Sequence, residues 1–298
     1  MHSGQSRRRV EDERFLRGTG RYLDDIAVPG ALHGFVLRSP YAHAAIVSVN
    51  TEAARTMPGV RGVFLAEDLR ADGLAPLPCT AKVATIGPII VPPRPALAEG
   101  RVRYVGDAVA FVVAETVLQA RDAAEAIEVE YDMLPAIADG AAALKPGAPQ
   151  LWEEAPGNLV FRFEKGDRAA VEAAFARAAH VVELEWMNTR VTAAPMEPRG
   201  GIATYDANAQ KFFLETSVFG LPEDRFTLVC PDVGGGFGAK NFLYPEHIML
   251  LFAARRLGAP VRWVAERTEE FLATCHGRDN RSKGRLALDA DGMVIGFH

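Results

Sequence analysis

The chain has few cysteines and no long apolar segment. Its three cysteines, Cys79, Cys230 and Cys275, stand far apart in 298 residues and have neither metal-ligand nor redox spacing. An odd number of distant cysteines argues against a disulfide framework and favours a reduced, cytoplasmic protein. No apolar run approaches the roughly 20 residues of a membrane span, and the N-terminus lacks the apolar core of a signal peptide.

The chain also has no excess of positive charge, because 33 Lys and Arg residues are outnumbered by 38 Asp and Glu residues and the formal net charge is -5. Proteins that bind nucleic acid are usually basic, so this class is disfavoured. Histidines are scattered: His43, His247 and His276 have no cysteine or carboxylate at ligand spacing, so no metal site is predicted from side chains. We expect each of these histidines to be an ordinary core or surface residue. No Gly-x-Ser-x-Gly motif is present, which disfavours a hydrolase of that type.

What is present is a mixture of short apolar strands and amphipathic helices, which predicts an α+β fold. The Pro- and Gly-rich residues 145–157 are typical of a linker. They divide the chain into an N-terminal tail (1–14), a first domain (15–144) and a second domain (158–298). Predicted strands cover residues 32–37, 45–49, 60–65, 109–113, 127–131, 180–187, 202–205, 212–216, 226–229, 261–264, 286–288 and 294–297. Predicted helices cover 51–57, 116–126, 167–179 and 244–256, with Thr51 and Asp167 as N-caps.

The most informative motif is the glycine-rich segment 231–238, Pro-Asp-Val-Gly-Gly-Gly-Phe-Gly. It lies between a predicted strand and a predicted helix, and glycines permit close approach and positive φ. Bare backbone amides beside a helix start could cradle an oxyanion or phosphate. The spacing matches neither nucleotide-binding glycine motif. A tight turn without a ligand is the alternative.

Three polar residues around this segment each have two interpretations. Glu197, in Pro-Met-Glu-Pro-Arg, could face a ligand, or it could pair with Arg199 to fix a loop. Asp232 could cap the amides of the glycine segment. Asn241 could face a substrate or serve as the N-cap of the following helix.

Several motifs occur in the order found in one enzyme family. They are 14–25 (Arg-Phe-Leu-Arg-Gly-Thr-Gly-Arg-Tyr-Leu-Asp-Asp), 38–44 (Arg-Ser-Pro-Tyr-Ala-His-Ala), 105–110, 129–135, 188–190, 195–199, the glycine segment, and 276–279 (His-Gly-Arg-Asp). Together they resemble the molybdopterin-binding large subunit of the molybdenum hydroxylases, which include xanthine dehydrogenase, aldehyde oxidase and aerobic carbon monoxide dehydrogenase. The resemblance implies an a/b hammerhead-like domain followed by an incomplete molybdopterin-binding α+β domain.

The resemblance also implies a chemistry. The family holds a molybdenum-molybdopterin cofactor, here expected as the dinucleotide, and uses water to hydroxylate a carbon centre or oxidise carbon monoxide. Electrons leave through iron–sulfur and FAD subunits. Gly235, Gly236, Phe237 and Gly238 are then the predicted cofactor-binding residues, and Asn241 and Glu197 are the substrate-side candidates. Purine-oxidising members carry Glu where this chain has Asn241, which disfavours a xanthine-type pocket.

Two departures from the family pattern bear on activity. Relatives have a longer segment, with a Gln near the metal, where this chain has only Val218, Phe219 and Gly220. The glutamate that acts as the family's base lies beyond this chain's length, so no residue is assigned as catalytic. We expect the isolated chain to be inactive, with a second chain completing the cofactor domain. A truncated or assembly module without activity is the alternative.

Overall fold

The structure is a computed structural model that describes residues 4, 6–79, 86–217 and 226–298. Residues 80–85 and 218–225, which include the shortened segment 218–220, lie outside the described residues. The fold mixes strands and helices, as the α+β prediction requires. None of the helices in the described ranges is long and apolar enough to cross a membrane.

The largest sheet has seven strands, and it contains strands from both predicted domains. β1 of the first domain pairs in parallel with β11 of the second, with Leu32 opposite Val261. The two domains are therefore joined by a continuous sheet, and the boundary at 145–157 remains a prediction. The strand order is β10 (Phe226–Val229), β9 (Lys211–Thr216), β8 (Gly200–Asp206), β11 (Val261–Val264), β1 (Leu32–Arg38), β5 (Ala108–Ala114) and β3 (Val60–Phe64).

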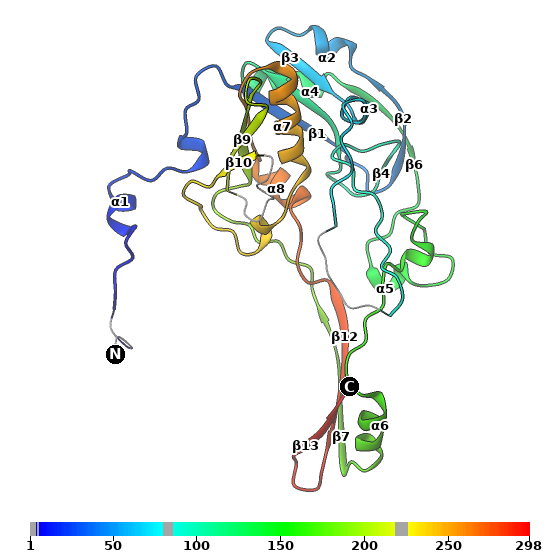
Figure 1. Ribbon diagram of the computed structural model, residues 1–298. Helices are drawn as coiled ribbons and strands as arrows, with labels where there is room; N and C mark the ends of the chain where they lie inside the picture. The colour runs from blue at the N-terminus through cyan, green and yellow to red at the C-terminus, as the bar shows by residue number, and fades with distance from the viewer. Residues whose placement is uncertain (1–3, 5, 80–85, 218–225) are drawn as a thin grey trace.

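Helices cover both faces of this sheet (Figure 1). α7 (Pro245–Leu257) packs on β8 and β11, whereas α4 (Val117–Glu125) and α2 (Glu52–Thr56) lie over the first-domain strands. β5 is buried along its whole length, as its continuous apolar sequence predicts. α4 begins at an N-cap, Thr116, whose side chain accepts a hydrogen bond from the Gln119 amide. The predicted cap Thr51 makes no such bond, because its hydroxyl accepts from Arg55 instead.

A second sheet of three strands completes the first domain, in the order β4 (Arg101–Val102), β2 (Ala44–Asn50) and β6 (Glu128–Met133). The segment predicted as a linker packs against this domain. The Arg103 guanidinium lies 3.6 Å from the ring centre of Trp152, and the Asn158 amide donates to the Ala143 carbonyl over 3.0 Å. The remaining short elements are α1 (Asp12–Leu16), η1 (Leu23–Asp25), α3 (Ala66–Ala71), α5 (Gly140–Ala143), η2 (Pro156–Asn158), η3 (Ala239–Asn241) and α8 (Arg267–Ala273).

The third sheet projects from the body as an arm (Figure 1). It consists of β7 (His180–Asn188), β12 (Asn280–Leu288) and β13 (Val294–Phe297), with α6 (Arg168–Ala176) packed on β13. The Asp167 N-cap and the final hairpin are confirmed. The alternating sequence of β7 predicts one buried face, but all nine residues are exposed. The reason is that the described chain places no layer over β7.

Burial in β5 gives a stability prediction. The Phe111 side chain is fully buried, and a Cβ on the facing Gly34 would lie only 2.4 Å from its ring. We expect Phe111→Ala to lower the free energy of unfolding by about 3–5 kcal/mol, because it leaves a large cavity. Urea unfolding measures this loss. Phe163→Ala is the control, since Phe163 is 54% exposed, and an equal loss in both variants would contradict the assignment of the core.

Candidate functional site

The glycine loop (residues 231–238) has a backbone that requires its glycines. Gly235 and Gly238 have φ of 96° and 88°, and Phe237 between them has φ of 47°. These values lie in the left-handed region that glycine adopts without strain. Gly234 is needed for a different reason, because a Cβ there would lie 2.5 Å from the Cβ of Glu197. The loop is therefore a specific conformation pressed against the Pro-Met-Glu-Pro-Arg segment.

The tip of the loop carries backbone donors that have no acceptor among the described residues. The amides of Gly235, Gly236, Phe237 and Gly238 donate to no other group within the described part of the chain. The Phe237 side chain is 79% exposed. Successive free amides of this kind form an anion-binding concavity. The cofactor-binding role of these four residues stays a prediction.

The helix start contributes nothing to this cradle, contrary to the strand–loop–helix expectation. α7 begins at Pro245, and its first turn is buried. The Tyr244 amide is already used, because it donates to His247 Nδ1 over 3.2 Å. Asn241 is exposed in η3 and is not the N-cap, which is Tyr244. The prediction of Asn241 as a cap was therefore wrong, while its substrate-facing role stays a prediction.

Glu197 fixes the glycine loop through hydrogen bonds to Gly234 and Lys240. Its Oε2 accepts hydrogen bonds from the Gly234 amide (2.9 Å) and the Lys240 ammonium (3.0 Å). Its Oε1 accepts from the Leu23 amide over 3.3 Å. Lys240 is fully buried, and burial lowers its pKa although the Glu197 carboxylate opposes this shift. The carboxylate thus has three donors within the protein, and its role toward a substrate stays a prediction.

Two predicted contacts of these carboxylates are replaced by others. Arg199 does not pair with Glu197, since its guanidinium lies among other partners described below. Asp232 does not cap the glycine amides, because it accepts from the Arg14 guanidinium and from the Arg21 amide (2.6 Å). The Arg14 hydrogen bond lowers the pKa of Asp232 to about 2. Both corrections have one cause: the fold brings residues distant in sequence to these carboxylates, Lys240 to Glu197 and Arg14 to Asp232.

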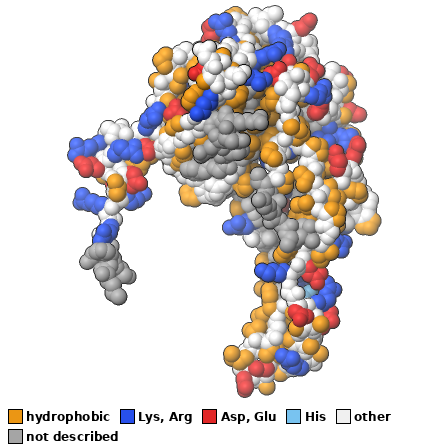
Figure 2. All heavy atoms as spheres, viewed as in Figure 1, with side chains coloured by type: hydrophobic (Ala, Val, Ile, Leu, Met, Phe, Trp, Pro, Cys, Tyr) orange, Lys and Arg blue, Asp and Glu red, His pale blue; other side chains and the backbone are white. Residues whose placement is uncertain are grey.

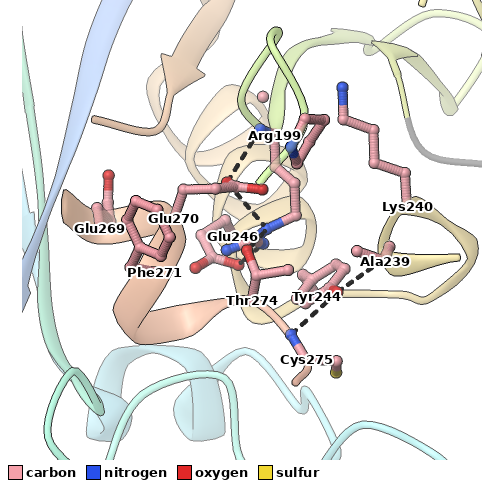
Figure 3. A network of polar contacts seen from close by, with 12 residues as sticks. Arg199, Ala239, Lys240, Tyr244, Glu246, Glu269, Glu270, Phe271, Thr274 and Cys275 are labelled. Atoms are coloured by element: carbon pink, nitrogen blue, oxygen red, sulfur yellow. Dashed lines mark hydrogen bonds and ion pairs between the residues drawn. The ribbon is translucent and has the colours of Figure 1, made fainter. Parts of the chain in front are cut away.

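Arg199 is the centre of a buried polar network (Figure 3). Its Nη1 lies 3.1 Å from Glu246 Oε2, and its Nε donates to the Thr274 hydroxyl over 2.8 Å. Its own amide donates to Glu270 Oε2 over 3.1 Å. The guanidinium also lies 3.8 Å from the ring centre of Tyr244, a cation–π geometry. The motif arginine therefore fixes the end of the Pro-Met-Glu-Pro-Arg segment.

The network continues into the first domain through Arg38, the arginine of the Arg-Ser-Pro motif. Arg38 Nη2 lies 2.6 Å from Glu246 Oε1 and 2.7 Å from Glu269 Oε1. Burial alone would raise the pKa of Glu246, but Arg199 and Arg38 outweigh it and the pKa is lowered. Sequence reasoning selected both arginines within motifs but missed Glu246. Its one signal, an acid in the first turn of a helix, is typical of many exposed residues.

Tyr244 and His247 tie the loop's exit to the sheet. The Tyr244 hydroxyl donates to the Ala239 carbonyl over 2.7 Å and accepts from the Cys275 amide over 3.3 Å. His247 Nε2 lies 3.3 Å from the Thr216 hydroxyl in β9. Burial lowers the pKa of His247 to about 4. Its Nδ1 accepts a backbone hydrogen bond, which requires the neutral ring.

Side chains offer no metal cluster at this site. Within the described ranges, no group of three or more His, Cys, Asp or Glu residues could hold a metal ion. His43 and His247 are buried, and His276 is exposed.

The pKa of His247 predicts a pH effect on stability. The folded pKa of about 4 lies below the unfolded value of about 6.5. The unfolded chain thus binds a proton first, and stability present above pH 6.5 is lost as the pH falls to 4, by at most about 3 kcal/mol. We expect His247→Gln to flatten this dependence in chemical unfolding at pH 7 and pH 4. The exposed His276→Gln should behave as wild type, and an unchanged slope in His247→Gln would refute the assignment.

The Glu246 carboxylate, shared by Arg199 and Arg38, gives a second prediction about stability. Glu246→Gln leaves Arg199 and Arg38 buried with less opposing charge, so we expect a loss of about 3–5 kcal/mol in unfolding free energy. Chemical unfolding at pH 7 measures it. Glu115→Gln removes a pair with Arg61 in which both side chains are about half exposed, and should change stability by less than about 1 kcal/mol. Equal effects of the two substitutions would sink this account of the network.

Two protein-family models match this chain. A family model of the molybdopterin cofactor-binding domain matches residues 151–298. A model of the aldehyde oxidase and xanthine dehydrogenase a/b hammerhead domain matches residues 17–135. The two models together account for nearly the whole chain, in the order that the motifs predict.

Individual relatives show the same match. The carbon monoxide dehydrogenase large chain of Hydrogenophaga pseudoflava is 37% identical over 96% of this chain and 38% of that protein. The nicotine 6-hydroxylase large subunit of Paenarthrobacter nicotinovorans is 35% identical over 97% of this chain and 36% of that protein. The quinoline 2-oxidoreductase structure from Pseudomonas putida 86 has a TM-score of 0.87 and 37% identity, covering 98% of this chain and 38% of that one.

The chain therefore spans little more than a third of the length of these relatives. The alignment with the carbon monoxide dehydrogenase chain covers 313 positions, more than the 298 residues present here, so that relative carries insertions within the aligned region. The motifs, the two family models and the fold lead to one conclusion: this chain belongs to the molybdenum hydroxylase family and corresponds to the N-terminal part of its molybdopterin-binding large subunit.

Proposed function

We propose that this chain forms part of a molybdenum-cofactor oxidoreductase and that its glycine loop contacts the cofactor. The observation that carries this proposal is the row of four amides, Gly235 to Gly238, that donate to no other described residue. When bound, the molybdenum–molybdopterin group supplies the redox chemistry, with water as the source of the oxygen inserted into the substrate. The protein supplies binding and orientation.

The loop's role follows from its rigidity. Glu197 accepts hydrogen bonds from the Gly234 amide and the Lys240 ammonium, and the amides of Phe237 and Gly238 have no acceptor among the described residues. Preorganised donors stabilise developing negative charge without reorganising during the reaction. We propose that these amides would help to hold the molybdenum–molybdopterin group when it is bound.

The exposed apolar surface of the arm is evidence that a further polypeptide segment covers it in the working enzyme. Val182, Leu184 and Trp186 lie on one face of β7, and each is 45–63% exposed. Alternate residues of a strand share a face, so these three form an apolar stripe. Contiguous exposed apolar surface marks an interaction site. Since the chain spans about 38% of its relatives, we propose that the remaining large-subunit portion covers this stripe, as a continuation or as a second chain.

Other partners and the substrate are proposed from the family. Electrons would pass to an iron–sulfur subunit and an FAD subunit, and the pterin would be in dinucleotide form. The related proteins are named for carbon monoxide, nicotine and quinoline, so we propose an aldehyde, an N-heterocycle, a similar carbon centre or carbon monoxide as substrate. Asn241 favours a substrate other than a purine. The cytoplasmic location stays a prediction.

The test is the molybdenum and pterin content of the protein purified from its own host, with co-purifying chains identified by mass spectrometry. Gly238→Ala and Gly292→Ala form a matched pair. Both glycines have positive φ, 88° and 80°, and a Cβ at either would meet no heavy atom within 4 Å. Both substitutions should therefore strain the backbone similarly, but only Gly238 lies in the glycine loop.

We expect near-stoichiometric molybdenum in the wild type and in Gly292→Ala, and about tenfold less in Gly238→Ala. Equal occupancy in the two variants would contradict the role of the loop. No molybdenum in the wild type would overturn the proposed function. It would leave the alternative, a catalytically inactive truncated or assembly module of the same family.

A further inference from the structure

The N-terminal segment reaches across the molecule to the glycine loop. Arg14 makes a bidentate contact with Asp232, two residues before Gly234, with its Nη2 2.6 Å from Oδ1. The Arg21 amide donates to the same carboxylate over 2.6 Å, and the Asp232 amide donates back to the Arg21 carbonyl over 3.0 Å. Residues about 211 to 218 positions apart in sequence are thus joined by four hydrogen bonds.

The same segment is attached at a second point. The Leu23 amide donates to Glu197, the carboxylate that also holds Gly234 and Lys240. The Leu23 side chain is 1% exposed and packs with Ile26 and Ile202. Residues 14–23, called here the N-terminal strap, are therefore anchored in the core at Leu23. They are bonded to the glycine loop directly at Asp232 and indirectly through Glu197.

The outer half of the strap is not held in place by burial of apolar side chains in the core. α1 has no buried residue, and Figure 1 shows it standing apart from the sheets. Its contacts with the body near Arg14 are the polar ones to Asp232. The tie therefore acts at the loop more than it contributes to the core.

A glycine loop needs such a tie. Glycine loses more conformational freedom on ordering than any other residue, and Gly235 and Gly236 have no side chains with which to hold themselves. Bidentate, charge-assisted contacts are among the strongest and most directional hydrogen bonds. A contact from outside the loop can therefore restrict it while leaving its amides free.

We propose that Arg14 is a positioning residue: through Asp232 it holds the glycine loop in its open-amide conformation before any ligand arrives. Arg14 precedes residue 17, where the hammerhead match begins, and so lies outside both matched regions. The purpose of the ordering rests on the function proposed above, but the ordering itself can be measured without a cofactor.

The test is amide hydrogen exchange on the full chain, read at Asp232 and Gly234, whose amides are both hydrogen-bonded. The variants are Arg14→Ala, Arg14→Lys and the control Arg17→Ala. Arg17 pairs only with Glu13 among the described residues, and that pair is exposed. Unfolding midpoints are measured for all variants, and because α1 buries nothing, all should fold.

We expect Arg14→Ala to speed exchange at both amides about fivefold, in line with a partly exposed ion pair, with no change in the unfolding midpoint. Arg14→Lys should fall between, since it keeps the charge but loses the bidentate geometry. The wild-type protection should shrink in 1 M salt.

Equal exchange in Arg14→Ala and Arg17→Ala would overturn the proposal. So would faster exchange at Asp232 with no change at Gly234, because the tie would then not reach the glycines. Absence of molybdenum in the wild-type protein would refute the proposed function, while the exchange comparison would still decide whether the strap orders the loop.

Discussion

Much of this structure depends on one buried carboxylate, Glu246, that is shared by Arg199 and Arg38. Burying charges is costly unless they are paired and hydrogen-bonded. The pairing is possible only when β1, α7 and the end of the Pro-Met-Glu-Pro-Arg segment meet. The interaction therefore fixes three elements from two predicted domains at once, and the continuous seven-stranded sheet is consistent with that requirement.

The glycine loop is held by residues that this buried network positions. Arg199 fixes the end of a short segment whose Glu197 reaches Gly234 and Lys240. Tyr244, stacked on the Arg199 guanidinium, holds the Ala239 carbonyl just beyond the loop. The loop thus owes its shape to buried neighbours on both sides, while four of its own amides have no acceptor among the described residues. A rigid support beneath an open set of donors is what a bound group with developing charge requires.

The arm has the opposite character. β7 is exposed on both faces, although it is paired with β12 along all nine residues. Backbone hydrogen bonds are satisfied there, but the apolar stripe of Val182, Leu184 and Trp186 has no cover in the described chain. Pairing and burial are separate requirements of a strand, and here only the first is met. This contrast agrees with a chain that spans about 38% of its relatives.

The sequence by itself determined the elements and the family. Apolar periodicity located most of the strands and the long helices, but it missed β4 and all but the last three residues of β12. Asp167 marked a helix start, and the ordered motifs identified a molybdenum hydroxylase. Only the tertiary structure decided which residues form ion pairs with each other. Glu197 binds Lys240 rather than Arg199, and Asp232 binds Arg14 rather than the glycine amides. The reason is physical: periodicity records which residues face a core, whereas an ion pair depends on which distant segments the fold brings within about 3 Å.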